Sequence, residues 1–504
     1  MPDFHPQEEL TTGQLQAVAD RAAEAALQTE PERPTTRHVT GAIAVLVLSA
    51  LVMILNETVL TVALPHLMAE FHVGADTVQW LTTGFLLTMA VVIPTTGWML
   101  QRFTTRAMFT AALGCFLLGT VLVTFAPAFG VILAGRIIQA FGTAVVLPLL
   151  MTTTLTYVPP QHRGTVMGLN SVVISVAPAI GPTLSGIVVG GLGWRYVFGL
   201  MLPIAAVVLV VGLLLLRSTG ETRAVPLDGF SVALSAVAFG GLVFGLGSIG
   251  ELFQGALFPL AAVAVGAVVL AFFIRRQVRL QRRDDAALLD LRPFTRPNFR
   301  LSVAIVMVCM AAMLGTVMVL PILLQNGMGI DVLTVGLILL PSGLVQGVLS
   351  PVIGRVYDRY GPRPLVIPGA VLLCAGQWWF ATLTPDTPVS GIIARHVVFS
   401  IGMAMLMTPL MTVSLGCLPR NLYGHGSAIL NTLQQLGGAA GTALLVAAMT
   451  VGASVAARGG ATEALAVVDG ARWAFVVGGA ITLVALVCAP FVRPLDREDE
   501  RTTV

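Results

Sequence analysis

The stretch GRVYDRYGPR at residues 354–363 lies between two long apolar runs. A partly matching repeat of it, GWMLQRFTTR, occupies residues 97–106. Each stretch is short and basic, so each is expected to form a loop on the cytoplasmic face of a membrane, where arginine accumulates. Two related loops in corresponding places predict that the chain consists of two duplicated membrane halves.

The composition is that of an integral membrane protein. The chain has 504 residues, of which 56% are hydrophobic and 11% are charged, and its mean hydropathy is +0.89. A soluble domain carries roughly 25% charged residues, so most of this chain must face lipid or other helices. The apolar runs are about 20 residues long and lack strict alternation, which predicts helices rather than a β-barrel.

Charge and cysteine content argue against several classes of function. The net charge of +3 is spread over short loops and does not indicate nucleic-acid binding. The five cysteines are dispersed without a CxxC pair, so neither a metal site nor a disulfide framework is predicted. No phosphate-binding GxxxxGK[ST] loop occurs, so ATP is not expected to be the energy source. No nucleophile–base pair or cofactor loop indicates an enzyme.

Apolar runs between breaking residues predict fourteen membrane helices. They lie near residues 41–63, 77–99, 107–126, 130–153, 165–190, 196–216, 229–248, 255–274, 300–324, 332–353, 365–383, 390–413, 425–450 and 472–492. The even number places both termini on one side of the membrane. With the N-terminus inside, the cytoplasmic segments hold 23 arginines and the outer loops three, which predicts that both termini are cytoplasmic.

These spans group into an all-α organisation with two similar halves. The predicted parts are a cytoplasmic tail at 1–40, a six-helix bundle at 41–216, two inserted helices and a loop at 217–299, a second six-helix bundle at 300–492 and a cytoplasmic tail at 493–504. Matching halves of this kind are the layout of a secondary transporter. The protein is expected to be a monomer in the cytoplasmic membrane.

The repeated stretches resemble a motif of the major facilitator superfamily, and specifically of its fourteen-span drug:proton antiporter family. The family phrase GxxxDRxGxR is matched in full by Gly354, Asp358, Arg359, Gly361 and Arg363. The first copy keeps Gly97, Arg102 and Arg106, but Gln101 stands in place of the aspartate and Thr104 in place of the second glycine.

Three helices of the N-terminal half carry further family motifs. The fourth helix has Leu133, Arg136, Gln139 and Gly142, and the fifth has the exporter motif Gly181, Pro182 and Gly186. In the first helix the family's acid position is Asn56, and the carboxylate stands one place later, at Glu57. This variant looks like the lincomycin-resistance branch. The resemblance implies a major facilitator fold with two six-helix halves and two inserted helices.

Glu57 is the one carboxylate that lies well inside a predicted span. A charge at membrane depth is costly and is a functional candidate by default, and a low-dielectric site lets a carboxylate hold a proton near neutral pH. Glu57 and Arg136 are each about six residues from the outer ends of their spans, which is roughly 9 Å of depth. We therefore expect Glu57 to carry the proton and Arg136 to stabilise its charged form in one state. The alternative is a permanent buried pair that fixes helix register.

The matched loops are expected to act as a conformational latch. Asp358 and Arg359 would make charge-assisted contacts to helix ends or to the other half in one access state and lose them in the other. The alternative, a loop that only orients the chain in the membrane, explains the arginines but not the spaced aspartate and glycines. Gln101 predicts a weaker clamp in the first copy.

Polar residues on helices that line the cavity in related folds are the substrate-binding candidates: Asn56, Thr58, Gln139, Asn431, Gln434 and Gln435. Their amide groups are expected to point away from lipid. In the second half, Arg395 is expected to cap backbone groups or to pack, and the alternative is that its neighbour His396 titrates.

The predicted function is proton-coupled export of amphipathic drugs, with protons and membrane lipids as the other partners and no cofactor. The alternative within transport is a dedicated exporter of an endogenous metabolite or lipid. A membrane receptor or scaffold is a third hypothesis, which the absence of a soluble output domain in this sequence disfavours.

Overall fold

The computed structural model describes residues 36–216, 225–283 and 287–495. The chain divides into two compact units, residues 1–41 and 42–504, and apart from the start of α2 every described helix lies in the second. All regular structure in the described residues is helical. The predicted tail at 1–40 falls almost entirely outside the described residues, as does most of the tail at 493–504.

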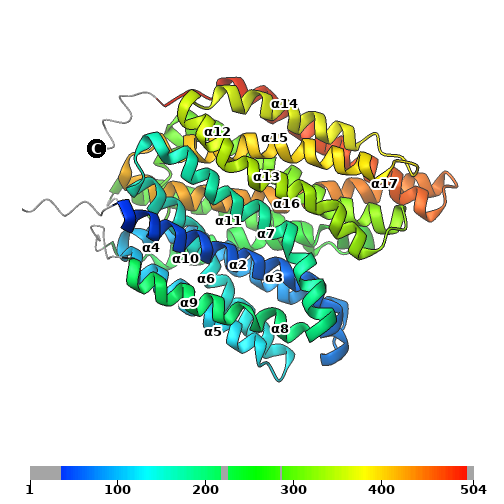
Figure 1. Cartoon of the computed structure of the whole chain (residues 1–504), viewed down its shortest axis with the longest axis horizontal. Helices are drawn as coiled ribbons and strands as arrows, with labels where there is room; N and C mark the ends of the chain where they lie inside the picture. Colours follow the sequence, from blue (N-terminus) through cyan, green and yellow to red (C-terminus); the bar gives the residue numbers. More distant parts are fainter. Residues whose placement is uncertain (1–35, 217–224, 284–286, 496–504) are drawn as a thin grey trace, which may run out of the picture. The chain divides into compact units, whose positions relative to one another are not determined.

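The first half of the chain forms a bundle of long helices (Figure 1). Its elements are α2 (Thr36–Phe71), α3 (Ala75–Val92), η1 (Ile93–Thr95), α4 (Thr96–Arg102), α5 (Thr105–Thr124), α6 (Phe129–Tyr157), η2 (Pro160–His162), α7 (Arg163–Leu192), α8 (Trp194–Gly199) and α9 (Met201–Leu215). The buried rings of Phe85, Phe109 and Phe116 lie in its core.

Two helices follow, and then a second bundle. The elements in the region predicted to hold the two inserted helices are α10 (Gly229–Gly247), η3 (Ile249–Gln254), α11 (Phe258–Arg283) and η4 (Arg292–Thr295). The second bundle comprises α12 (Pro297–Ile322), the π-turn η5 (Leu323–Gly327), α13 (Val332–Tyr360), α14 (Arg363–Phe380), α15 (Val389–Gly416), η6 (Arg420–Leu422), α16 (Tyr423–Arg458), α17 (Glu463–Cys488) and η7 (Ala489–Phe491). Figure 1 shows α7 and α13 between the remaining helices of the two bundles.

Each predicted span overlaps a helix, and twelve described helices are long and apolar enough to cross a membrane. The other two predicted spans coincide with α7 and α14. The last predicted start, residue 472, is wrong because α17 begins at Glu463. Asp469 and Arg472 form an i,i+3 ion pair of 3.3 Å there, so a charged turn extends the helix beyond its apolar part.

The two repeated stretches are mostly helical, which corrects the prediction of loops. Residues 354–360 form the last turns of α13, and only Gly361 and Pro362 separate them from α14. In the first copy α4 ends at Arg102, and two residues connect it to α5. Gly361 has a φ of 76°, a conformation that side chains with a Cβ rarely adopt, so the tight turn needs glycine here.

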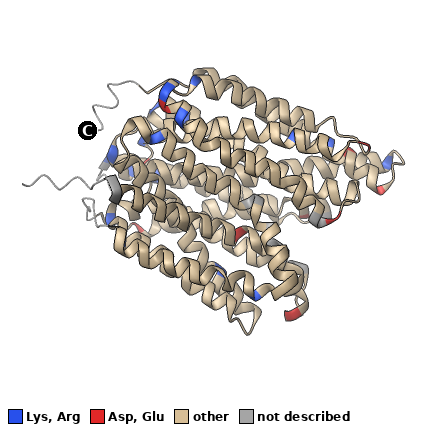
Figure 2. Cartoon of the chain, in the orientation of Figure 1, with Lys and Arg blue, Asp and Glu red and all other residues tan. Residues whose placement is uncertain are grey.

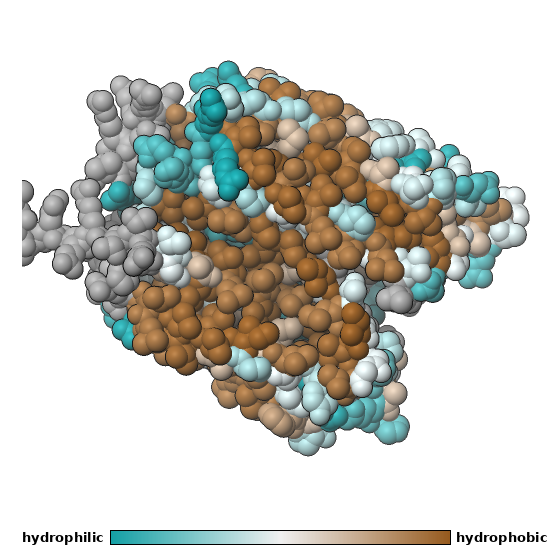
Figure 3. All heavy atoms as spheres, in the orientation of Figure 1, coloured by the Kyte–Doolittle hydropathy of each residue, from teal (hydrophilic) through white to brown (hydrophobic). Residues whose placement is uncertain are grey.

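The surface carries a broad hydrophobic belt with hydrophilic residues toward both ends (Figure 3). Figure 2 shows that most described basic residues gather at one end of the helices, the end that holds α4. The basic end and the apolar belt together are what a helix bundle needs to sit across a bilayer in one orientation. The chain is therefore a multi-pass membrane protein.

Candidate functional site

Arg136 on α6 is completely buried, and uncharged groups stabilise its guanidinium. Nη1 donates hydrogen bonds to Asn56 Oδ1 at 2.9 Å and to Gln139 Oε1 at 3.1 Å, and Nε points to the Leu81 carbonyl oxygen at 3.5 Å. The guanidinium lies 4.1 Å from the centroid of the Phe85 ring. A buried charge is costly unless it is paired or hydrogen-bonded, and here amides and a π face share that task.

The amides around Arg136 are themselves held in place. Gln139 Nε2 donates to Thr120 Oγ1 at 2.9 Å, and both side chains are completely buried. The helices approach closely at this point, because a Cβ on Gly119 would lie 2.7 Å from Gln139 Cγ. The site of Arg136 is therefore preorganised by the packing of α5 against α6.

Glu57 stands beside this cluster but does not join it. Its side chain is only partly buried, whereas that of Asn56 is completely buried. Within the described residues no hydrogen bond or ion pair joins Glu57 to Arg136, although the two charges interact through space. One residue corresponds to about 100° of helix rotation, so Asn56 occupies the position facing the arginine and Glu57 points elsewhere. The buried ion pair considered from the sequence is not formed in this conformation.

The exporter motif brings α7 against α2. A Cβ on Gly181 would overlap Thr58 Oγ1, and Thr58 Oγ1 also lies 3.4 Å from the Ala177 carbonyl oxygen. Ser185, which the sequence analysis missed, donates to the Val59 carbonyl oxygen at 2.7 Å. Gly186 faces open space, and the side chain of Pro182 lies outside the described residues. The helix that carries Glu57 is thus bonded to α7, the helix that meets the second half.

Asp358 at the end of α13 binds the first turn of α7. Its two carboxylate oxygens accept hydrogen bonds from Gly164 N at 2.7 Å, from Thr165 N at 2.8 Å and from Thr165 Oγ1 at 2.6 Å. These amide groups are unpaired donors at a helix N-terminus, where the helix dipole also favours a negative charge. The contact joins residues 194 positions apart and connects the two halves. We call it the Asp358 clasp.

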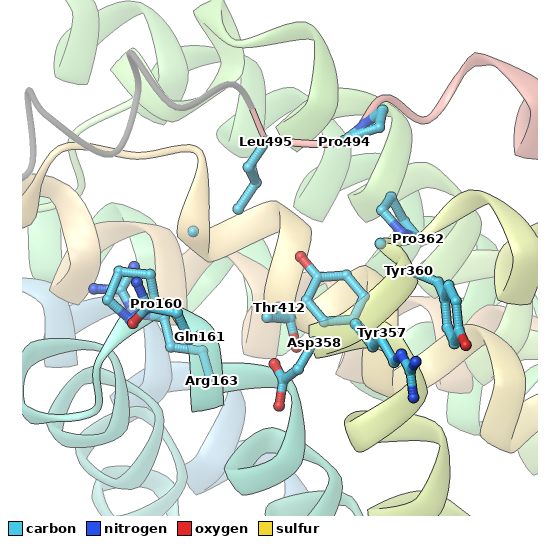
Figure 4. Close-up of a pocket in the computed structure, with 13 residues that line it drawn as sticks. Pro160, Gln161, Arg163, Tyr357, Asp358, Tyr360, Pro362, Thr412, Pro494 and Leu495 are labelled. Atoms are coloured by element: carbon cyan, nitrogen blue, oxygen red, sulfur yellow. The ribbon is translucent and has the colours of Figure 1, made fainter.

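Glycines allow this approach. A Cβ on Gly354 would overlap the Gly164 carbonyl oxygen, and a Cβ on Gly164 would lie 2.6 Å from Asp358 Oδ1. The same pair of helices stays close further along, where Gly168 meets the Ser350 carbonyl oxygen. A cavity of about 460 Å³ opens beside the clasp, and Figure 4 shows Asp358 and Tyr357 facing Gln161 and Arg163 across it.

The first copy of the repeat makes a different contact. Gly97 packs on His425 near the start of α16. A Cβ added to Gly97 would lie 2.6 Å from His425 Nδ1. In the described part of the chain no hydrogen bond links Gln101 to α16. Instead the backbone N–H of Asp290, in the segment after the inserted helices, donates to His425 Nδ1 at 3.2 Å. The polar contact at this interface comes from the inserted region.

That segment is anchored to the inserted helices. Gln277 on α11 accepts a hydrogen bond from Leu289 N at 3.3 Å and donates to Ser231 Oγ at 2.8 Å. Burial raises the pKa of Asp228, but hydrogen bonds from Ser231 and Arg276 outweigh it and hold the pKa below its usual value. The inserted helices therefore position a buried segment against α16.

The remaining predicted latch residues lie on the surface. Arg102, Arg359 and Arg363 are exposed, and among the described residues none of them bonds to the opposite half. Arg359 stacks over the ring of its neighbour Tyr360, with 5.2 Å between the guanidinium carbon and the ring centroid. Of the predicted latch residues, Gly97, Gly354 and Asp358 are the ones that contact the opposite half in the described part of the chain.

The predicted substrate contacts divide into two groups. Asn56 and Gln139 are occupied by Arg136, and Thr58 is bonded within α2 and toward α7. Asn431 Nδ2 donates to the Ser427 carbonyl oxygen, and Gln434 Nε2 is buried without a hydrogen-bond partner among the described groups. Gln435 is partly buried, with Nε2 3.9 Å from Met89 Sδ across the two halves. Among the described groups, Asn56 Nδ2 and Gln434 Nε2 are buried without a hydrogen-bond partner, and Gln435 makes only a long contact to sulfur, so these three amides retain bonding capacity.

The second half contains no copy of the Arg136 cluster in its described residues. Arg395 donates to the carbonyl oxygens of Trp379 at 3.0 Å and Gly391 at 2.9 Å, which is a backbone-capping role. His396 is buried between the rings of Phe380 and Phe399, and its Nδ1 has no described partner. No group of three or more His, Cys, Asp or Glu side chains in the described residues is placed to hold a metal.

Sequence reasoning missed the partners of the latch residues. Gly164, Thr165 and His425 were not singled out, although Gly164 and Gly168 have the small-xxx-small spacing that lets membrane helices approach. That spacing was a usable signal for the α7 side of the clasp. Nothing in the local sequence around His425 indicates its contact with a segment 135 residues away.

The chain is similar to proteins of one known family. A family model for the Major Facilitator Superfamily matches residues 46–442. The lincomycin resistance protein LmrB of Bacillus subtilis is 39% identical over 456 residues, which cover 89% of this chain and 94% of that protein. The MFS-type transporter YcnB of the same organism is also 39% identical, over 93% of this chain and 98% of its own length.

Solved structures share the fold at low sequence identity. The human organic anion transporter MFSD10 superposes with a TM-score of 0.65 at 16% identity, covering 90% of this chain and all of that one. The proton:xylose symporter XylE superposes with a TM-score of 0.63, also at 16% identity, covering 93% of this chain and all of that one. The chain is a membrane transporter and not an enzyme, and it belongs to the Major Facilitator Superfamily.

Proposed function

We propose that the chain is a proton-coupled antiporter that exports amphipathic drugs across the cytoplasmic membrane by alternating access. In this proposal it is a monomer with fourteen spans, cytoplasmic termini, and the proton gradient in place of a cofactor. The observation that carries it is the partly exposed Glu57 carboxylate, which lies inside the membrane region and, among the described residues, forms no ion pair with the nearby buried Arg136. Resemblance to LmrB supports drugs as the substrate class.

Glu57 is the proton carrier in this mechanism. Because Asn56 rather than Glu57 binds the guanidinium, the carboxylate keeps both oxygens available for a proton or for a cationic substrate group. Arg136 stays charged and fixed by Asn56 and Gln139, and its positive charge favours release of the proton from Glu57. Substrate and proton then alternate at one carboxylate, which is the requirement for exchange.

The Asp358 clasp holds one access state. When α7 and α13 separate at this end, the carboxylate loses three hydrogen bonds to α7 at once, so closure is discrete rather than gradual. Since Thr58 and Ser185 form hydrogen bonds between α2 and α7, and Gly181 packs closely on Thr58, a movement of α7 also moves the helix that carries Glu57. This path couples protonation to access.

The energy of one proton is sufficient for useful export. A proton moving down ~150 mV yields roughly 3.5 kcal/mol, which sustains a gradient of about 300-fold for a neutral substrate. Exchange of one proton for a monovalent cation is electroneutral and feels only the pH difference. A single membrane carboxylate therefore suits neutral or singly charged lipophilic substrates.

Resistance measurements test the proposed substrate class. A susceptible bacterium that expresses the chain should tolerate more lincomycin than one carrying an empty vector, and should retain less ethidium. Loss of both effects in Glu57→Gln would tie them to the carboxylate. Wild-type protein that is present in the membrane but protects against neither compound would contradict drug export and favour a dedicated metabolite or lipid exporter.

Asp358→Asn should shift the protein toward the state in which the clasp is open. Asparagine has one acceptor oxygen and no charge, so the clasp loses about 1.5–3 kcal/mol, which is a tenfold or larger shift in population. A reporter cysteine at Ser427→Cys, buried against the Pro148 carbonyl oxygen across the halves, should then react faster with maleimide. The matched control is Asp386→Asn, which removes an exposed carboxylate elsewhere. Equal labelling of both variants and the wild type would contradict the latch.

A further inference from the structure

An apolar groove lies between the start of α12 and the end of η7, and it shares no lining residue with the cavity beside the clasp. It encloses about 450 Å³ and is lined by Pro297, Asn298, Arg300, Leu301, Phe491 and Arg493. Of these six lining residues two are arginines and none is acidic. The groove thus pairs an apolar surface with concentrated positive charge.

A reciprocal pair of hydrogen bonds brings the two arginines to the same groove. Asn298 Nδ2 donates to the Arg493 carbonyl oxygen at 3.2 Å, and Arg493 N donates to Asn298 Oδ1 at 3.1 Å. These bonds tie together segments 195 residues apart and fix the backbone of Arg493 against the first turn of α12. Arg300 lies on that same helix, and both arginine side chains are exposed.

The groove sits at the boundary of the membrane. Phe491 is the last residue of the candidate span Glu463–Phe491, and Arg300 is in the first turn of the span Pro297–Gly327. The ring of Phe491 is 62% exposed, so an apolar wall faces the lipid while the arginines stand at headgroup level. Arginine near a membrane surface attracts anionic headgroups, and its guanidinium matches phosphate geometry.

We propose that this groove is a binding site for one anionic phospholipid. Its phosphate lies between Arg300 and Arg493, and part of an acyl chain lies along Leu301 and Phe491. Charge complementarity selects an anionic lipid over a zwitterionic one, and the apolar walls select a lipid over free phosphate. This proposal does not depend on the proposed drug-export function.

Native mass spectrometry of the purified full-length chain tests the site. Detergent-solubilised protein is titrated with phosphatidylglycerol or phosphatidylcholine, and the fraction carrying one lipid is measured. The wild type should bind one phosphatidylglycerol more tightly than phosphatidylcholine. Arg300→Gln/Arg493→Gln should weaken phosphatidylglycerol binding by about fivefold for each arginine removed. Arg300→Lys/Arg493→Lys keeps the charge and should retain most of the affinity.

The control removes the same charge elsewhere on the basic end. Arg279 and Arg282 are exposed on α11 and do not line the groove, so Arg279→Gln/Arg282→Gln should leave the single tight adduct unchanged. Gel filtration confirms that each variant is folded and monodisperse. Equal loss of the adduct in the control pair would overturn the proposal, because the lipid would then follow bulk charge. Equal binding of the two lipids by the wild type would overturn it as well.

Discussion

Glu57→Gln is expected to abolish substrate accumulation driven by a pH gradient while leaving exchange of substrate without a gradient in place. Glutamine has nearly the same shape but cannot take up or release a proton. Ethidium accumulation, which the pH difference sustains at about tenfold for each pH unit in one-for-one exchange, should therefore collapse toward unity. In the structure the side chain makes no hydrogen bond to Arg136, so the substitution leaves the bonds from Arg136 to Asn56 and Gln139 in place. Proteoliposomes loaded with ethidium under an imposed gradient provide the measurement.

Two comparisons make that result specific. Glu463→Gln removes an exposed carboxylate at the start of α17 and should transport like the wild type. Exchange of labelled for unlabelled substrate without a gradient should persist in Glu57→Gln, because exchange requires no net proton movement. Normal gradient-driven accumulation by Glu57→Gln would show that another group carries the proton, and His396 would be the next candidate.

Gly354→Ala is expected to be the most disruptive small substitution at the interface of the two halves. Its Cβ would overlap the Gly164 carbonyl oxygen, which is backbone and cannot rotate away. Overpacking of this kind costs about 1–3 kcal/mol, and here the cost falls on the state in which α7 and α13 meet. Transport should drop by tenfold or more, and the Ser427→Cys reporter should become accessible, as in Asp358→Asn.

Gly186→Ala is the matched control for that prediction. Both substitutions add one methyl group to a helical glycine, and alanine favours a helix over glycine by up to about 1 kcal/mol in each case. A Cβ on Gly186 meets nothing within 4 Å, so this variant should transport normally and be at least as stable as the wild type. Full activity of Gly354→Ala would contradict a close approach of the two backbones during the cycle.

The sequence predicted the helical architecture well because that information is local. Apolar runs and breaking residues set the positions of the helices, of which twelve in the described residues are long and apolar enough to span a membrane. The fourteen-span count and the division into two halves with two inserted helices stay predictions. The loop prediction for the repeat was wrong because residues 354–360 carry charges that were assigned to a loop, whereas they continue α13 past its apolar part. Composition distinguishes segments that face lipid from segments that face water. It does not distinguish a loop from the solvated end of a helix.

The site depended on contacts that no local pattern contains. The sequence singled out both Asn56 and Glu57, but the direction of each side chain is decided by how α2 packs against α6. Likewise Asp358 was recognised as a residue that would bind a helix end, while its partners at Gly164 and Thr165 follow only from the packing of α7 on α13. Gln101 predicted a weaker clamp in the first copy, and no local pattern indicated that the Asp290 segment contacts His425 there.

Proton movement driven by substrate tests the central claim most directly. Proteoliposomes containing the wild-type protein and the trapped pH dye pyranine are mixed with ethidium, with no imposed gradient. Antiport through Glu57 predicts that the lumen loses protons as ethidium enters, and that Glu57→Gln gives no change in pyranine fluorescence. Entry of ethidium without any change in lumenal pH would contradict proton-coupled antiport, whatever the substrates of the protein prove to be.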